Sequence, residues 1–263
     1  FQPADLPQAA AALASLGYLG KHKAADEGPG ITKHTSTYKR PTAAADTPNP
    51  YLSTSGDRHV DPHGSLEECW FGLCTDITPG IWPRAMAHTV NGQPAQALSA
   101  NDLYLHLAVH LIYHLLMGKP SLVQLVDLLV VSQRLAAQLD WDWLLQRAQQ
   151  THAAPFLAAA NHLAQTVLAA PVPADIQTRL LAGLPAHLRR TIGSLDADSV
   201  MQLSQRPPLT TMRQRVARGI SERRATARWA TSSAGRWAVW RSALAVTRTD
   251  TARLLARRLG LIR

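Results

Sequence analysis

From Ser99 onward, apolar residues recur every three or four positions, the spacing that lines one face of a helix. Ser99 and Asp102 have the form of a capping box before a helix that runs to about Met117 and ends at Gly118. Four more helices are expected, from Pro120 to Leu135, from Trp141 to Ala153 after an Asp140 cap, from Pro155 to Ala170, and from Pro171 onward. No repeat of fixed length is present, so the pattern predicts a helical bundle and not a solenoid.

The region before Ser99 has shorter and more broken patterns. An alanine-rich helix is expected from Asp5 to Leu16, stopped by Gly17. Residues 31–40, ITKHTSTYKR, predict a strand, and residues 42–57 predict a loop. Residues 70–98 predict turns and short extended pieces.

These elements together predict a mostly helical α+β protein in three parts. The first part, residues 1–97, is a partial α+β domain, and the second, residues 98–204, is a helical bundle domain. The third part, residues 205–263, is an Arg-rich helical extension. The chain has 263 residues, 46% of them hydrophobic, which is enough to bury a sizeable core.

Charge changes this picture only for the extension. The chain carries a formal charge of +9, but residues 206–263 alone hold fourteen Arg against Glu222 and Asp250, a net of +12. Tryptophans interleave with these arginines along two expected helices, Met212 to Ala230 and Arg236 to Leu259. The extension is interpreted as a docked basic helix pair, as a nucleic-acid contact, or as a contact with an anionic membrane.

The location of the protein is expected to be cytoplasmic. Residues 1–20 lack the pattern of a signal peptide, and the most apolar stretch, Leu103 to Met117, is too short to span a membrane. Cys69 and Cys74 lack a second pair that would complete a zinc site, and they are expected to be two buried thiols in a reducing compartment. Because the chain begins with Phe1 and not with Met, we expect it to be a fragment.

A polar stripe runs along the expected helix after Ser99. Asp102, His106, His110 and His114 recur at every fourth residue, so their side chains share one face. The stripe allows three interpretations: a metal site, a hydrogen-bonded seam between helices with Asp127 as partner, or the wall of a cleft.

The nonapeptide at residues 58–66, RHVDPHGSL, predicts a second strand. In an extended strand, His59, Asp61 and His63 would share one face, and Pro62 argues against a central position in a sheet beyond Asp61. The segment allows three interpretations: a metal site made by the three side chains, a solvated edge strand, or Asp61 alone as the functional group, an oxygen ligand for Mg²⁺ beside the phosphates of a nucleotide. The sequence contains no phosphate-cradling glycine loop, G-x-S-x-G, C-x-x-C or H-E-x-x-H motif.

The order of several segments resembles the uncharacterised bacterial nucleotidyltransferases, a family with a polymerase-beta-like core. The segments are FQPADLPQAAAALASLGY, RHVDPHGSL, ALSANDLYLHLAVHLIYHLL, LVQLVDLLVV and LDWDWLLQRAQQ, and the resemblance runs from Phe1 to about Ala182. It implies a small mixed nucleotidyltransferase sheet packed against the helical bundle. It also implies transfer of a nucleoside monophosphate from an NTP to an unknown hydroxyl acceptor, with Mg²⁺ as cofactor.

The resemblance assigns roles to individual residues. Asp61 takes the place of the third acidic residue, a catalytic carboxylate and metal ligand, and His63 is the histidine two positions later. His106, His110 and Asp127 match family positions and are candidates for the wall of the nucleotide or acceptor cleft.

One part of the family pattern is missing. Such proteins carry a Gly-Ser turn and an Asp-x-Asp strand directly before the segment that corresponds to Pro3–Pro7, and this sequence holds neither there. We therefore expect an N-terminally truncated chain that is inactive by itself. The alternative is a helical adaptor without enzymatic activity, whose basic tail binds an acidic partner, nucleic acid or a membrane surface.

Overall fold

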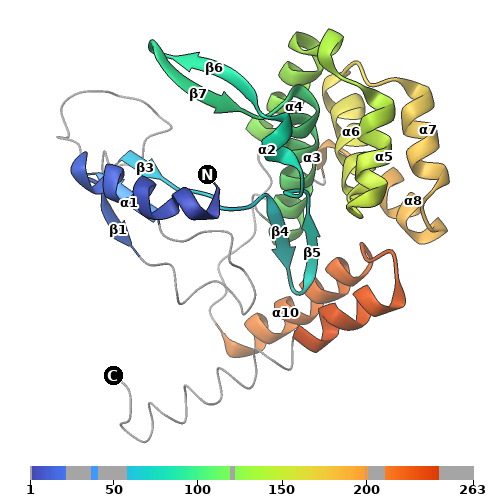
Figure 1. Cartoon of the computed structure of the whole chain (residues 1–263). Helices are drawn as coiled ribbons and strands as arrows, with labels where there is room; N and C mark the ends of the chain where they lie inside the picture. The colour runs from blue at the N-terminus through green and yellow to red at the C-terminus, as the bar shows by residue number, and fades with distance from the viewer. Residues whose placement is uncertain are drawn as a thin grey trace, which may run out of the picture. The chain divides into compact units, whose positions relative to one another are not determined.

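A computed structural model describes residues 2–21, 37–40, 58–118, 122–198, 200 and 211–242. The chain divides into two compact units, Phe1–Glu67 and Glu68–Arg263 (Figure 1). The fold is α+β and mostly helical, as the sequence predicts.

The first unit begins with a short helix whose end is locally encoded. A 3-10 turn, η1 (Pro3–Asp5), leads into α1 (Leu6–Ser15). Gly17 adopts a φ of 80°, and the N–H groups of Gly17 and Tyr18 donate to the carbonyls of Ala14 and Leu13 at 3.0 Å each. This Schellman arrangement needs a residue that tolerates positive φ, which confirms the predicted stop at Gly17.

Three short strands form the sheet of this unit. β1 (Leu19–Lys21), β2 (Thr37–Arg40) and β3 (Arg58–Val60) pair antiparallel in that order, so β3 is an edge strand. Arg40 connects the sheet to α1, because its guanidinium donates to the carbonyl of Leu16 at 3.1 Å and lies over the ring of Tyr18. The strand predicted over residues 31–40 is confirmed for β2, and the remainder lies outside the described residues.

Two β-hairpins account for the predicted short extended pieces. β4 (Glu67–Trp70) and β5 (Leu73–Asp76) form one, and β6 (Met86–Val90) and β7 (Gln93–Ala97) form the other, with the short helix α2 (Ile81–Arg84) between them. Both turns place two residues at positive φ, Phe71 and Gly72 in the first and Asn91 and Gly92 in the second. Two consecutive positive φ values define the tight turn that suits the twist of paired strands.

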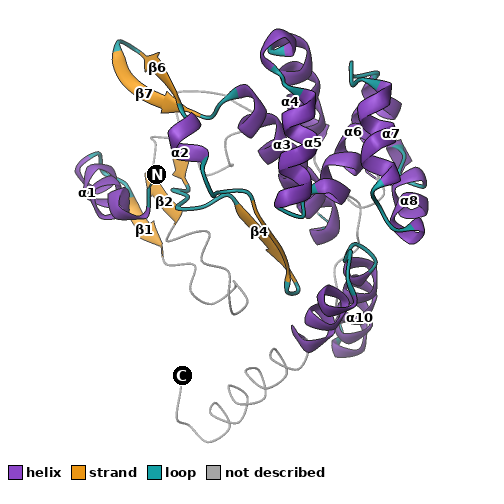
Figure 2. Ribbon diagram, turned by 45° about the vertical axis from the view of Figure 1, so that its right-hand side comes forward, coloured by secondary structure: helices purple, strands orange, loops and turns teal. Residues whose placement is uncertain are grey.

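The helices of the bundle lie side by side in Figure 2. They carry most of the buried apolar side chains. The elements of the bundle are α3 (Ala100–Met117), α4 (Leu122–Arg134), the 3-10 turn η2 (Ala136–Gln138), α5 (Trp141–Gln150), α6 (Ala154–Leu168), α7 (Ala174–Ala182) and α8 (Ala186–Gly193). α3 and α6 pack together, and Tyr104 on α3 donates to the buried side-chain oxygen of Asn161 on α6 at 2.8 Å. The predicted helices are confirmed to within a few residues at their ends.

The Arg-rich extension docks on the bundle and on the β4–β5 hairpin. α10 (Met212–Ala227) begins with a capping box of Thr211 and Gln214, and a second helical stretch covers residues 233–242. Between them, buried Trp229 stacks on Phe156 of α6 with ring centroids 5.9 Å apart. The guanidinium of Arg223 lies over the Phe71 ring at 4.2 Å. The described part of the extension is therefore docked on the bundle and on the first hairpin.

The hairpin turn also approaches the second helical stretch closely. A Cβ added at Gly72 would lie 3.1 Å from the carbonyl oxygen of Ala238, a distance tighter than most real contacts. Within the described part of the chain, no helix is both long enough and apolar enough to cross a membrane.

Candidate functional site

Asp61 lies immediately after the edge strand β3 in the first unit. Its side chain is exposed, whereas the following Pro62 is buried and His63 is half-buried. The strand ends at Val60, so the prediction of one continuous strand through residues 58–66 is wrong. Pro62 has no N–H to donate and cannot continue the ladder. The side chain of His59 lies outside the described residues.

The turn after Asp61 packs closely on α1. A Cβ added at Gly64 would lie 3.1 Å from the Cδ1 atom of Leu6, the first residue of α1. Glycine at this position lets the chain pass against the helix. The segment that carries Asp61 and His63 is thereby held against the helix that the Pro-x-Asp-Leu-Pro segment begins.

The first unit supplies only part of what a metal ion needs. A carboxylate is the hard oxygen ligand that divalent cations such as Mg²⁺ prefer, so the chemistry of Asp61 fits. Among the described residues, however, Asp61 belongs to no group of three side chains whose ligand atoms converge. The described residues of the first unit therefore provide one oxygen ligand and not a complete metal site.

Three histidines of the second unit form a column of tilted rings along α3. The ring of His110 lies 4.2 Å from that of His114 and 5.5 Å from that of His106, centroid to centroid. Nδ1 of His110 lies 2.7 Å from Oε1 of Glu68 on β4, and the side-chain amide of Gln124 on α4 donates to Nδ1 of His114 at 3.0 Å.

The column is a hydrogen-bonded seam between elements. This confirms one of the three interpretations of the stripe, but the partners differ from the expected Asp127. Asp127 is exposed on α4, whereas Gln124, one turn earlier, contacts His114. In the described part of the chain, the imidazoles do not converge with further ligands into a metal-binding group.

The fourth member of the stripe, Asp102, has a separate role. Its carboxylate is 3% exposed and receives Nε of Arg84 at 2.9 Å and Nη2 at 2.6 Å. This hydrogen bonding raises the pKa of Arg84. The Ser99 hydroxyl accepts a hydrogen bond from the backbone N–H of Asp102, as a helix cap does. The Asp102 carboxylate binds Arg84 and the Ser99 hydroxyl instead of the backbone N–H of Ser99. Only half of the predicted capping box is formed.

Two further cationic contacts fix the loop before α2. The Arg84 guanidinium lies 5.0 Å above the Trp143 ring, and Nη2 of Arg147 donates to the carbonyls of Ile77 and Pro79. Burial and the neighbouring Arg84 cation lower the pKa of Arg147. These contacts hold the connection between the first hairpin and α3 against α5.

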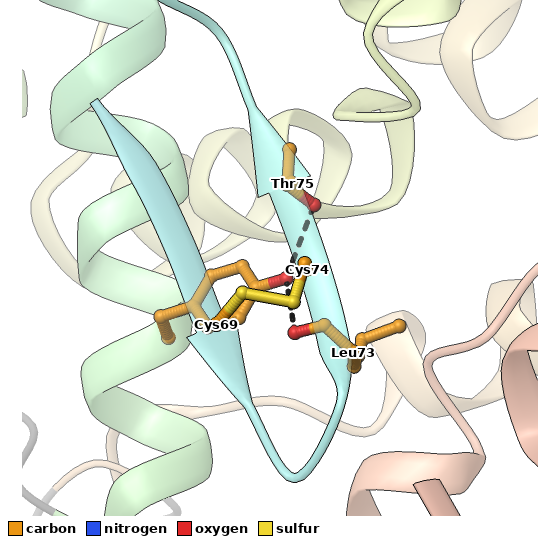
Figure 3. The surroundings of a disulfide bond; sticks show 5 residues. Cys69, Leu73, Cys74 and Thr75 are labelled. Carbon is orange, nitrogen blue, oxygen red and sulfur yellow. Dashed lines mark hydrogen bonds between the residues drawn. A yellow bond between two sulfur atoms is a disulfide. The ribbon is translucent and has the colours of Figure 1, made fainter. Parts of the chain in front are cut away.

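The two cysteines are not free thiols. Cys69 on β4 and Cys74 on β5 form a disulfide across the hairpin (Figure 3), which overturns the expectation of two buried thiols. Cys69 is buried, and Cys74 is exposed. Next to the bridge, the Tyr113 hydroxyl donates to the carbonyl of Leu73 and shares a hydrogen bond with Thr75, both at 3.1 Å.

Sequence reasoning missed Glu68, Gln124 and the disulfide. Glu68 precedes His110 by 42 positions, and no local pattern links a glutamate on a short strand to a histidine on a later helix. The five-residue spacing of Cys69 and Cys74 on either side of a Phe-Gly turn was a usable signal, because a two-residue hairpin brings such positions face to face.

A hollow of about 590 Å³ opens between α3, α8 and α10. Its size is in the range of sites for small organic molecules. Its lining is mostly apolar, including Leu115, Leu116 and Trp229, with Arg218 and Glu222 among its polar members. None of the candidate site residues from the sequence lines it, so it is a separate feature of the second unit.

Comparison with known proteins identifies the family. A sequence model of the family described as uncharacterised nucleotidyltransferase matches residues 1–169. No curated protein and no solved structure matches the chain. The matched region contains Asp61 and His63, the histidine column of α3, and Asp127. The chain therefore belongs to the family of uncharacterised nucleotidyltransferases.

Proposed function

We propose that the protein takes part in the transfer of a nucleoside monophosphate from an NTP to a hydroxyl group of an acceptor. The observation that carries the proposal is an exposed carboxylate, Asp61, at the end of an edge strand within a region that matches a nucleotidyltransferase family. Membership of this family does not favour the alternative of a helical adaptor without enzymatic activity.

In the proposed reaction, the acceptor oxygen attacks the α-phosphorus of the NTP in line with the leaving group. The bond from the α-phosphorus to its bridging oxygen breaks, pyrophosphate departs, and the acceptor hydroxyl loses its proton. Bound Mg²⁺ would neutralise the negative charge of the triphosphate.

Asp61 is proposed to act as one oxygen ligand of that Mg²⁺. Support comes from its exposure and from the close packing of Gly64 on Leu6, which fixes the segment that follows it. His63, two positions later and half-buried, is proposed to contact the nucleotide. The remaining carboxylate ligands are expected from the Asp-x-Asp element of the family pattern.

Roles for His106, His110 and Asp127 at the nucleotide stay predictions of the family resemblance. The contacts of His110 with Glu68 and of His114 with Gln124 support a structural role for the column itself. Asp127, exposed on α4, is the member of this set whose side chain is most accessible to a ligand.

The test measures nucleotide binding as a function of Mg²⁺. A fluorescent ATP analogue is titrated into the product of the whole gene, including any coding sequence before Phe1, with Mg²⁺ or with EDTA. Asp61→Asn is expected to lose the Mg²⁺-dependent part of binding, and pyrophosphate release with it, because the amide carries no charge to hold the cation. Far-UV circular dichroism checks that the fold is retained.

Asp5→Asn is the matched control. Asp5 is another exposed carboxylate of the first unit, and its side chain makes no capping hydrogen bond to α1. Its replacement is expected to leave Mg²⁺-dependent binding unchanged. Equal binding by the wild type and Asp61→Asn would remove Asp61 from the mechanism.

A further inference from the structure

The outer face of α10 combines exposed aliphatic and cationic side chains. Arg213, Val216, Ile220 and Arg224 follow one another at spacings of three or four residues, so they form one stripe along the helix. All four are exposed, Val216 at 54% and Ile220 at 50%. Toward the C-terminal end of the same helix, Arg223 lies over the Phe71 ring and Thr226 is buried, so α10 is docked there while Val216 and Ile220 stay exposed.

The second helical stretch repeats this combination with aromatic residues. Trp237 and Trp240, three positions apart, are 64% and 38% exposed, and Arg236 and Arg241 beside them are exposed as well. Val239, between the tryptophans in sequence, is fully buried, so the helix has a docked side and an outer side. Tryptophan side chains prefer the interface between water and lipid, where an apolar ring and a polar N–H are both accommodated.

From these faces we infer that the C-terminal extension binds the surface of an anionic lipid bilayer. The described residues 211–242 contain eight Arg and a single acidic residue, Glu222, so the surface complements negative headgroups. Exposed apolar side chains beside the arginines can enter the headgroup region while the guanidinium groups meet phosphates. The extension lies on the membrane and does not cross it, which agrees with the absence of a spanning helix among the described residues.

The surface of the extension differs in charge from another exposed apolar face, that of α4. α4 exposes Val123 at 51% and Val126 at 43%, values close to those of α10, but its neighbouring exposed ionisable residue is the acidic Asp127. Anionic lipid attracts the first surface and repels the second. α4 therefore provides a control with similar apolar exposure and opposite charge.

A single-stranded nucleic acid would also meet cations and tryptophans, but it explains fewer of the exposed side chains. Bases stack on aromatic rings such as those of Trp237 and Trp240. Val216 and Ile220 have no ring on which a base can stack, whereas a bilayer accepts aliphatic and aromatic side chains alike. The bilayer accounts for all four exposed apolar residues.

The test uses sedimentation of the full 263-residue chain with vesicles. We expect binding to phosphatidylcholine vesicles that contain phosphatidylglycerol, little binding to pure phosphatidylcholine, and weakening as salt is raised. Arg213→Gln with Arg224→Gln is expected to weaken binding by up to about thirtyfold, and Trp237→Ala with Trp240→Ala by about tenfold. Val216→Ser with Ile220→Ser is expected to weaken it several-fold.

Matched variants on the bundle complete the experiment. Arg134→Gln with Arg190→Gln removes two exposed arginines elsewhere, and Val123→Ser with Val126→Ser removes similar apolar exposure; both are expected to bind vesicles as the wild type does. Circular dichroism confirms folding of each variant. Equal loss in the bundle variants, equal binding to neutral vesicles, or binding of oligothymidylate in the absence of vesicle binding overturns the inference.

Discussion

Arg84 and Asp102 make a two-point contact in which Nε and Nη2 of the guanidinium meet the two carboxylate oxygens at 2.9 and 2.6 Å. The contact ties α2 to the first turn of α3, and the carboxylate is 3% exposed. Arg179 and Asp142 form an ion pair of the same 2.6 Å length on the surface, with side chains 50% and 76% exposed. The chain thus allows a direct comparison between a partly buried pair, in which Arg84 is 32% exposed, and an exposed one.

Asp102→Asn is expected to lower the free energy of unfolding by about 2 kcal/mol, because it leaves the Arg84 cation beside a buried neutral group. Asp142→Asn is expected to change it by less than about 0.5 kcal/mol, since water screens the exposed pair. Urea unfolding followed by circular dichroism measures both. Equal effects would mean that burial does not strengthen the Arg84 contact.

His110→Ala tests whether the histidine column is structural. The substitution removes the 2.7 Å contact to Glu68, whose side chain is 3% exposed, and is expected to lower the free energy of unfolding by about 2 kcal/mol. His88→Ala, on the exposed strand β6, is the control and is expected to stay within about 0.5 kcal/mol of wild type. An unchanged urea midpoint for His110→Ala would leave the column without a structural role.

Gly72→Ala tests the docking of the extension on the first hairpin. Gly72 has a φ of 78°, and an added Cβ would lie 3.1 Å from the backbone oxygen of Ala238. Gly92, in the second hairpin, has a φ of 77° and no atom within 4 Å of such a Cβ. The backbone strain is therefore matched, and only Gly72 adds a clash.

We expect a loss of about 1 kcal/mol for Gly92→Ala and about 2–3 kcal/mol for Gly72→Ala. Thermal unfolding measures the difference, and limited proteolysis is expected to cut the extension of Gly72→Ala faster than that of the wild type. Equal losses of stability in the two variants would show that the close approach of the Gly72 turn to residues 233–242 does not stabilise the fold.

The disulfide is expected to add about 2 kcal/mol to stability, since it closes a short loop in the unfolded chain. Denaturant unfolding with and without dithiothreitol measures this contribution. Cys69→Ser with Cys74→Ser is the control, and its unfolding is expected to be insensitive to the reductant. A thiol assay on the unreduced, denatured protein should find no free thiol; two thiols would show that the bridge does not form.

The helices of the bundle were predictable because their signals are local. Ser99 before α3, Asp140 before α5 and the apolar spacing inside each helix appear in the sequence without reference to the rest of the fold. The stop at Gly17 follows from the same kind of signal. The Asn91-Gly92 pair is a recognised hairpin signal, so the second hairpin was within reach of the sequence as well.

The side-chain partners were not predictable because they join distant segments. The stripe on α3 shows that its polar groups need partners, but it does not show that His110 faces Glu68 or that Asp102 faces Arg84. Asp127 was a reasonable partner by helix spacing, but Gln124, one turn earlier on α4, is the residue that contacts His114. The identity of a partner depends on packing between elements, which periodicity does not encode.

The stack of Trp229 on Phe156, nearly parallel at 8°, has a consequence for a nicked chain. A protease that cuts once between residues 200 and 211 separates the extension from the bundle covalently, but the indole stays inserted beside α6. The two fragments would then elute together from a sizing column under native conditions and separate only in denaturant. The C-terminal fragment would thus stay bound to the bundle by non-covalent contacts alone.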